Sequence, residues 1–307
     1  MKEITIISGK GGTGKTSIVA SFAALANNAV LADCDVDAAD LHLILTPTIR
    51  RRESFSGGST ARIKSGYCVA CGKCEELCRF DAIYFDGPGN GSVPRTFRVD
   101  PIACEGCGVC EWFCDYDAIE FKPQINGTLY VSDTRYGPMV HAALGIAEEN
   151  SGKLVTLVRT TAKEKAEKEG RDTIIVDGSP GIGCPVIASI SGADMVVAVT
   201  EPTLSGRHDL ERVIDLTSHF KIPIGVIVNK YDLNSEMSAE IEAVAKQRNV
   251  ETFGRIRYDR DFTRAMVAGK NIVEHGGSAA EDVKMAWERV SARLTSLAEK
   301  GQSPKSV

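Results

Sequence analysis

The stretch Gly9–Thr16, which reads Gly-Lys-Gly-Gly-Thr-Gly-Lys-Thr, constrains the fold more than any other part of the chain. A β-branched run, Ile4–Ser8, precedes it, and an apolar run, Ser17–Leu25, follows it, so we expect a buried strand, a glycine-rich turn and a helix. Glycines let backbone N–H groups turn toward a polyphosphate, and the helix N-terminus favours negative charge there. The expected nucleotide ligands are Gly11, Gly12, Thr13, Gly14, Lys15, Thr16 and Ser17.

The same glycines also fit the dinucleotide fingerprint Gly-x-Gly-x-x-Gly, with Asp33 or Asp35 at the position of its acidic residue. Lys15 and Thr16 have no role in a dinucleotide site. In a nucleoside-triphosphate site, Lys15 reaches the β- and γ-phosphates and the Thr16 hydroxyl binds Mg²⁺. The sequence therefore favours a nucleoside triphosphate with Mg²⁺.

Composition narrows the class of protein. The 307 residues, 43% of them hydrophobic, suffice for one large domain or two smaller ones. A net charge of −5 gives no sign of nucleic-acid binding, and no run approaches the length of a membrane span. We expect a cytoplasmic protein without a leader peptide or membrane anchor, in which ten cysteines serve metal or redox chemistry rather than disulfides.

Carboxylates follow two further apolar runs that we expect to be strands. Ala29–Asp33 leads into Asp35, and the run from Thr173 ends at Asp177, which a glycine-rich loop containing Gly181 follows. Carboxylates at the carboxyl ends of strands beside a phosphate-binding loop are placed for Mg²⁺ and for water. We therefore expect Asp33, Asp35, Asp177 and Gly181 to respond to the nucleotide.

An alternation of strands and helices continues to the end of the chain. The strands that we expect are Leu154–Val158, Met195–Thr200, Ile224–Val228 and, at an edge, Glu251–Ile256. The helices that we expect are Met139–Glu149, Ala162–Glu169, Ser205–Phe220 and Ala279–Leu297. Asn229 and Lys230 follow one of these strands, where the Asn229 amide could contact an adenine base.

Between residues 46 and 131 the pattern changes, and a cysteine-rich segment repeats itself. The segment Cys68–Ile83 recurs 36 residues later as Cys104–Ile119, and nine of the 16 aligned positions are identical. Each copy has the spacing C-x2-C-x2-C-x3-C of bacterial ferredoxins, in which three close thiolates and one distant thiolate hold a [4Fe–4S] cluster. Zinc is the rival occupant, although structural zinc sites use two pairs of ligands.

In two-cluster ferredoxins the fourth cysteine of each run binds the other cluster. The first cluster is therefore assigned to Cys68, Cys71, Cys74 and Cys114. The second cluster is assigned to Cys104, Cys107, Cys110 and Cys78. The proline that usually follows the fourth cysteine is replaced by Arg79 in the first run and by Asp115 in the second.

Taken together, these motifs resemble those of the MinD/ParA/Mrp/nitrogenase-iron-protein P-loop ATPases, with a two-cluster ferredoxin domain inserted. Lys10–Thr16 resembles their deviant Walker A motif, Asp33-x-Asp35 their first switch and Asp177–Gly181 their second. The resemblance implies a doubly wound, mostly parallel α/β sheet of the SIMIBI type, made of residues 1–45 and 132–307. Residues 46–131 would form an inserted α+β ferredoxin-like domain.

The resemblance also implies roles for single residues. Lys10 would reach across an ATP-dependent or constitutive homodimer to the partner's phosphates, and Lys15 would neutralise phosphates within its own subunit. Asp35 would position or deprotonate the attacking water, and Asp177 would hold Mg²⁺ through water. ATP or ADP, Mg²⁺ and two [4Fe–4S] clusters are then the expected cofactors.

Three functions fit this combination. The first is an ATP-gated electron carrier with a redox partner protein. The second is an Mrp-like ATPase that delivers clusters to an acceptor, although the Cys-x-x-Cys pair of that branch is missing after Cys114. The third is a MinD-like positioning or scaffolding ATPase with sensory or structural clusters. Cys184 lies where nitrogenase iron protein has a bridging cysteine, so a cluster shared between subunits and a plain buried cysteine both stay open.

Overall fold

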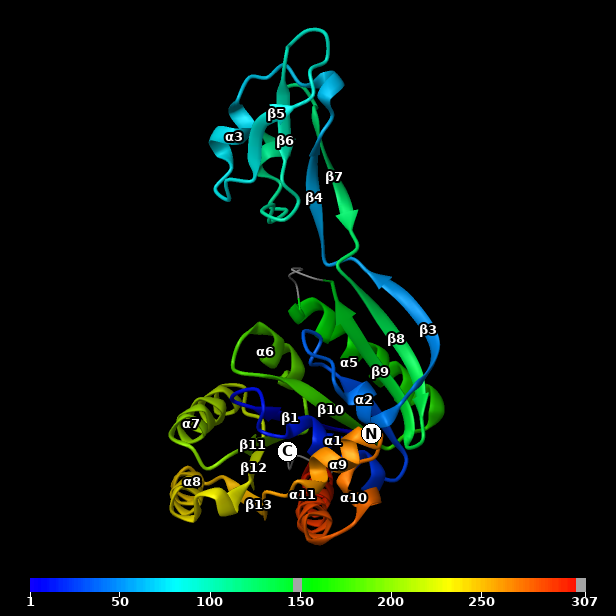
Figure 1. Cartoon of the computed structure of the whole chain (residues 1–307), viewed down its shortest axis with the longest axis vertical. Helices are drawn as coiled ribbons and strands as arrows, with labels where there is room; N and C mark the ends of the chain where they lie inside the picture. Colours follow the sequence, from blue (N-terminus) through cyan, green and yellow to red (C-terminus); the bar gives the residue numbers. More distant parts are fainter. Residues whose placement is uncertain (146–150, 302–307) are drawn as a thin grey trace, which may run out of the picture. The chain divides into compact units, whose positions relative to one another are not determined.

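A computed structural model describes residues 1–145 and 151–301, and it separates them into two compact units (Figure 1). The larger unit contains residues 1–53, 129–143 and 151–307, as far as they are described. The second, which we call the cysteine-rich unit, contains residues 54–128 and the described part of 144–150. Within the described ranges no helix is both long and apolar enough to cross a membrane.

A nine-stranded sheet forms the centre of the larger unit, in the order β13-β12-β11-β1-β10-β2-β9-β8-β3. Each adjacent pair from β13 to β9 is parallel, as the buried apolar runs of the sequence predict. The strands are β1 Lys2–Ser8, β2 Ala29–Asp33, β3 Thr48–Phe55, β8 Gly127–Thr134, β9 Gly137–Leu144, β10 Thr173–Pro180, β11 Met195–Thr200, β12 Ile224–Asn229 and β13 Glu251–Ile256.

Helices cover both faces of this sheet, because alternate residues of its strands point to opposite sides. Ile4 and Ile6 of β1 belong to one apolar core and Ile7 to the other. The first core also contains α1, α2, α10 and α11, and the second contains α6, α7 and α8. The helices are α1 Lys15–Leu25, α2 Leu41–Leu45, α5 Ser151–Glu169, α6 Cys184–Ile190, α7 Leu204–His219, α8 Ser235–Gln247, α9 Asp261–Val267, α10 Ile272–His275 and α11 Ser278–Gly301.

The α/β class with a large, mostly parallel sheet is thereby confirmed, but two predicted elements are wrong. Residues 139–144, expected at the start of a helix, lie in strand β9, whose Met139 pairs with Leu31 of β2. Residues 146–149 of that predicted helix lie outside the described ranges. Leu154–Val158, expected as a strand, lies inside helix α5, where Leu154, Val155 and Val158 are buried at helical spacing. Short apolar runs fit either structure, and packing against the sheet decided both cases.

The cysteine-rich unit consists of short elements around the two repeats. Strands β4 (Gly58–Ile63) and β7 (Ile119–Gln124) pair antiparallel, and so do β5 (Ile83–Gly87) and β6 (Thr96–Val99). The helices α3 (Lys73–Leu77) and α4 (Val109–Trp112) occupy equivalent places in the two repeats, each beginning after a glycine with positive φ. Its small apolar core contains Cys68, Ile83, Phe97 and Ala118.

Candidate nucleotide site and cysteine cavities

The glycine-rich loop joins β1, which lies between β10 and β11 in the middle of the sheet, to helix α1. Gly12 and Gly14 have φ angles of 80° and 89°, a conformation that glycine adopts without a steric penalty. A Cβ atom at Gly11 or Gly12 would meet no atom within 4 Å, so the loop borders open space. Gly14 is the N-cap of α1 and no side chain caps this end, which leaves its N–H groups available to an anion.

Lys15 begins α1 and points into a group of buried carboxylates. Its Nζ atom lies 2.5 Å from Oδ1 of Asp177 and 3.5 Å from Oδ2 of Asp35. The Lys15 and Asp177 side chains are only 5% and 1% exposed. The structure thus brings together Lys15 of α1, Asp177 of β10 and Asp35, which follows β2. These three residues were predicted from the sequence to lie at one site.

The protonation of this group follows from burial and charge. Burial opposes the charge of Lys15, but Asp177 and Asp35 outweigh it and raise the Lys15 pKa. Burial, and then the charge of Asp177, raise the pKa of Asp33 well above its usual value. Burial also raises the pKa of Asp35, against the lowering effect of Lys15. The positive charge of Lys15 therefore stabilises the ionised forms of Asp33 and Asp35.

Three buried polar atoms of this site have no hydrogen-bond partner among the residues that the structure describes: Thr13 Oγ1, Asp33 Oδ2 and Asp177 Oδ2. Buried polar atoms usually have partners, so unpartnered ones suggest a missing ligand. Hard oxygen atoms are the donors that Mg²⁺ prefers. Thr16, the predicted Mg²⁺ ligand, lies in the first turn of α1. Gly181, predicted to respond to the nucleotide, donates its N–H to the Ser8 carbonyl at 2.8 Å.

Asn229 lies at the end of β12, against the glycine-rich loop, and is 5% exposed. Its Nδ2 donates to the Thr13 carbonyl at 2.7 Å, and its Oδ1 accepts from the Lys230 N–H at 3.0 Å. Both ends of the amide therefore contact the protein in this structure. Its contact with a base stays a prediction.

Lys10 lies at the loop's surface and contacts residues that sequence reasoning assigned no role. Its Nζ is 2.7 Å from Oε1 of Glu201, and it donates to Ser205 Oγ at 3.0 Å and to Thr203 Oγ1 at 3.3 Å. Lys230 bonds the other oxygen of Glu201 at 2.9 Å. The available signal was that Glu201 directly follows a buried apolar run, at the same sheet edge as the phosphate-binding loop.

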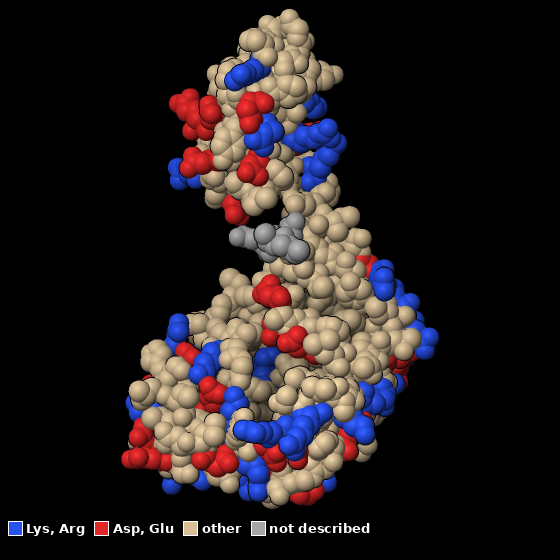
Figure 2. Space-filling model, in the orientation of Figure 1, with Lys and Arg blue, Asp and Glu red and all other residues tan. Residues whose placement is uncertain are grey.

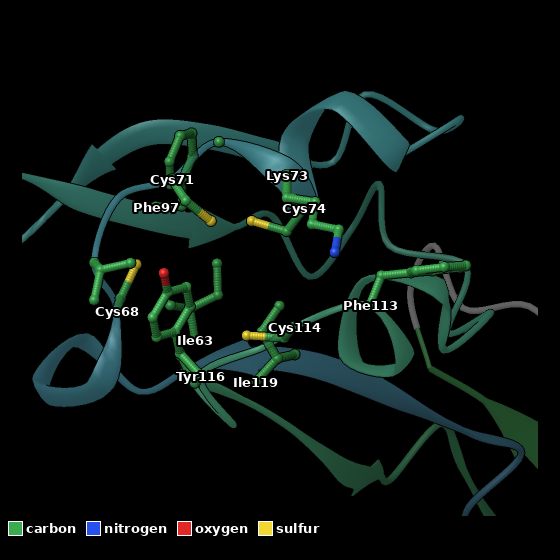
Figure 3. A pocket seen from close by; sticks show the side chains of 13 residues that line it. Ile63, Cys68, Cys71, Lys73, Cys74, Phe97, Phe113, Cys114, Tyr116 and Ile119 are labelled. Atoms are coloured by element: carbon green, nitrogen blue, oxygen red, sulfur yellow. The ribbon is translucent and has the colours of Figure 1, made fainter.

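Two cavities of the cysteine-rich unit are lined by the eight repeat cysteines in two sets of four. Cys68, Cys71, Cys74 and Cys114 line one cavity, and Figure 3 shows their sulfur atoms pointing into it beside Tyr116. The other cavity is lined by Cys78, Cys104, Cys107 and Cys110. The cavities hold about 360 and 340 Å³ of empty space, counting space open to solvent. Each set mixes three cysteines of one repeat with the fourth cysteine of the other.

In the part of the chain that the structure describes, no three cysteine, histidine or carboxylate side chains are placed to share one metal ion. Burial raises the pKa of Cys74 and of Cys110, the third cysteines of the two runs, to about 11 in each case. At neutral pH these thiols keep their protons, and binding of a metal would remove them, because a coordinating thiol is deprotonated outright. The cluster assignments therefore stay predictions. Cys184 is exposed at the start of α6, in the larger unit.

The sheet order and the glycine-rich loop define a nucleotide-binding protein of the doubly wound α/β class. Residues 4–272 match the CobQ/CobB/MinD/ParA nucleotide binding domain, and the chain belongs to that family. The uncharacterized protein MJ0578 of Methanocaldococcus jannaschii is 31% identical over 94% of this chain and 96% of its own length.

Solved structures of similar fold include MinD proteins. The cell division ATPase MinD of Pyrococcus furiosus is 16% identical, with a TM-score of 0.56, over 95% of this chain and 98% of its own. The septum site-determining protein MinD of Pyrococcus horikoshii, complexed with Mg-ADP, is 18% identical, with a TM-score of 0.56, over 96% of this chain and 98% of its own. At these identities the likeness establishes the fold alone.

Proposed function

We propose that this protein is an ATP-hydrolysing, dimer-forming switch of the MinD/ParA type, whose cysteine-rich unit is a ferredoxin-like domain that holds two [4Fe–4S] clusters. The observation that carries the ATPase part is the buried group of Lys15, Asp33 and Asp177 beside an open glycine-rich loop. The Mg-ADP complex of a MinD protein of similar fold supports the choice of ligand.

The residues of the site would act as follows. The N–H groups of the glycine-rich loop bind phosphate oxygens, and Lys15 exchanges its contact with Asp177 for one with a phosphate. Asp177 and Thr16 would then hold Mg²⁺, which supplies positive charge beside the phosphates. Asp35, whose pKa is raised by burial, accepts a hydrogen bond or a proton from the attacking water. Lys10 would act on the nucleotide of a second subunit, which makes hydrolysis depend on dimerisation.

Two sets of four cysteines, each lining its own cavity, support the iron–sulfur part of the proposal. A [4Fe–4S] cluster takes each thiolate on a different iron, so its four sulfur ligands surround a cavity rather than share a single ion. Phe97 and Ile119 contribute apolar walls to the first cavity, and apolar surroundings limit the access of water to a cluster.

The positioning or scaffolding role is the first candidate, since the proteins of similar fold include a septum site-determining MinD and a MinC:MinD cell division complex. In that role the clusters would sense redox state or stabilise the insert. Electron transfer gated by ATP is the second candidate, because both cysteine cavities occur in one small unit, as a short electron relay requires.

Anaerobic reconstitution tests the proposal. We expect about eight irons per chain, a dimer that forms with ATP but not with ADP, and hydrolysis that depends on Lys15. Cluster absorbance and EPR would then be followed without nucleotide, with ADP and with ATP. A potential that shifts with ATP favours electron transfer, whereas an ATPase rate that changes with oxidation state at constant potential favours sensing. A protein that binds neither ATP nor iron would refute the proposal.

Substitutions can test the pairing of the cysteines. Cys71→Ser with Cys74→Ser should leave about four irons, held in the second cavity. In that background Cys78→Ser should remove the remaining cluster, whereas the matched Cys114→Ser should leave it intact. The reverse result would mean that each repeat binds a cluster with its own fourth cysteine.

A further inference from the structure

Glu201 occupies a position between the two lysines that border the phosphate-binding loop. It directly follows β11, the neighbour of β1 in the sheet, and its side chain is 16% exposed. One carboxylate oxygen, Oε1, is 2.7 Å from Lys10 Nζ, and the other, Oε2, is 2.9 Å from Lys230 Nζ. Burial raises the Glu201 pKa, but its bonds to Lys10 and Lys230 outweigh burial and lower it, so the group is a carboxylate at neutral pH.

The backbone fixes the position of this carboxylate. The Thr200 hydroxyl donates to the Gly206 carbonyl at 2.9 Å, and Thr203 caps α7 by accepting from the Gly206 N–H at 3.0 Å. A Cβ atom at position 206 would lie 2.3 Å from the Glu201 carbonyl oxygen, so the close approach of α7 requires a glycine. Glu201 is therefore presented by a strand end and a helix start that pack tightly together.

Lys10 has all of its donors occupied in this arrangement. An ammonium group has three N–H donors, and the three acceptors are Glu201, Ser205 and Thr203 of the same subunit. Lys230, through its second bond to the Gly12 carbonyl at 2.9 Å, joins Glu201 to the glycine-rich loop. A Lys10 amine held in this way can reach another subunit only after its contact with Glu201 breaks.

We infer that Glu201 is a positioning residue that holds Lys10 within its own subunit and thereby restrains the ATP-dependent pairing of two subunits. This inference rests on the proposed function for the role of Lys10. A nucleotide bound at the loop brings negative charge close to Glu201, and like charges repel at short range. This repulsion weakens the contact of Glu201 with Lys10, so the bound nucleotide releases Lys10 toward a second subunit.

The contact between Glu201 and Lys10 can be tested in a single subunit, by the reactivity of the Lys10 amine. In nucleotide-free protein we expect Glu201→Gln to increase the rate at which an amine-reactive ester modifies Lys10 about three- to tenfold, the range expected for losing a partly exposed ion pair. Glu201→Asp, whose shorter side chain cannot reach both lysines, should act in the same direction. The matched control is Glu242→Gln, which removes the ion pair with Arg255 and should leave Lys10 unchanged. Equal rates in wild type and Glu201→Gln would overturn the inference.

A second measurement tests the effect on pairing. Glu201→Gln should dimerise at an ATP concentration about three- to tenfold lower than wild type in sedimentation or light scattering. In a Lys10→Gln background the same change should have little effect. A Glu201→Gln variant that needs more ATP than wild type would overturn the restraint. Wild-type protein that binds ATP and stays monomeric would instead refute the proposed dimer switch, while Lys10 labelling would still decide whether Glu201 holds Lys10.

Discussion

Replacing Lys15 with methionine should destabilise the nucleotide-free larger unit in a manner that depends on pH. The substitution keeps a side chain of similar length and removes the charge that contacts Asp177 and Asp35 at 2.5 and 3.5 Å. With an effective dielectric constant near 20, the two attractions amount to about 7 and 5 kcal/mol before desolvation is subtracted. Removing one partner of a buried ion pair costs about 3 to 5 kcal/mol, and we expect a loss of that size at neutral pH.

The sign of the pH dependence follows from the carboxylates that remain. The folded-state pKa values of Asp33 and Asp35 are already raised, chiefly by burial, and Lys15 is a group that lowers both. Without Lys15 they should rise further. A carboxyl group with a raised folded pKa favours unfolding once the pH exceeds its ordinary value near 3.8, and most strongly above the raised value. The stability deficit of Lys15→Met should therefore be largest at neutral pH and shrink as the pH falls toward 4.

The chain offers a local probe for the assay. It has two tryptophans; Trp287 packs on Phe22 of α1, with ring centroids 4.9 Å apart, whereas Trp112 lies in the cysteine-rich unit. In a Trp112→Phe background, fluorescence during urea unfolding reports on the larger unit alone. Unfolding would be measured without nucleotide from pH 5 to pH 8.

One control variant and two possible outcomes test this reasoning. The matched control is Lys230→Met, because Lys230 pairs with Glu201 in a more exposed setting and should cost at most about 1 kcal/mol. A Lys15→Met deficit that is constant with pH would show that lost packing, not unpaired charge, is its cause. Adding Asp33→Asn to Lys15→Met should restore stability at neutral pH, and failure to do so would lead to the same conclusion.

Four further outcomes can be checked directly. Lys10→Ala should retain nucleotide affinity and lose most hydrolysis, with rescue in mixed dimers by an otherwise inactive partner; normal hydrolysis would contradict action across a dimer. Gly14→Ala should abolish nucleotide binding in calorimetry, because its Cβ would lie 2.5 Å from Asn229 Nδ2 and its φ is 89°. Arg135→Ala should lower the unfolding free energy by about 2 kcal/mol, since Arg135 pairs with Glu274 and also donates to backbone carbonyls; an unchanged urea midpoint would refute this role. Burial lowers the His141 pKa to about 4, so protonation of the unfolded state should reduce stability as the pH falls from 6.5 to 4, a slope that His141→Gln should remove.

The sequence allowed much of the larger unit to be predicted, for identifiable reasons. The strand, glycine-rich turn and helix around Lys15 could be recognised because a phosphate-binding loop requires particular residue types. Glycines allow the turn, a lysine contacts the phosphates and a threonine binds Mg²⁺. The structure confirms strands at Met195–Thr200 and Glu251–Ile256, the latter at the sheet edge as expected. The predictions for residues 139–144 and 154–158 were wrong, because their short apolar runs have no decisive period. Pairing with β2 selects a strand for the first of these runs, and the second lies inside α5.

The contacts of Glu201 could not be predicted from the sequence, for a different reason. Its neighbours in space, Lys10 and Lys230, are distant in the chain, and only the sheet order places β11 beside β1. The grouping of the eight repeat cysteines, by contrast, could be predicted. The spacing of the repeats indicated how the cysteines divide, and the two cavities divide them in the same way. Whether iron occupies those cavities is still a prediction.

The chain enters and leaves the cysteine-rich unit through two segments that lie side by side. Strands β3 and β8, which precede and follow that unit in the chain, are neighbours in the sheet. At their ends the Asn126 N–H donates to the Phe55 carbonyl at 2.8 Å, and its Oδ1 accepts from the Gly57 N–H at the same distance. The first and last residues of the cysteine-rich segment are therefore hydrogen-bonded neighbours. A short turn in place of residues 57–125 would join β3 and β8 directly, so a chain without the cysteine-rich unit should keep every strand of the nine-stranded sheet.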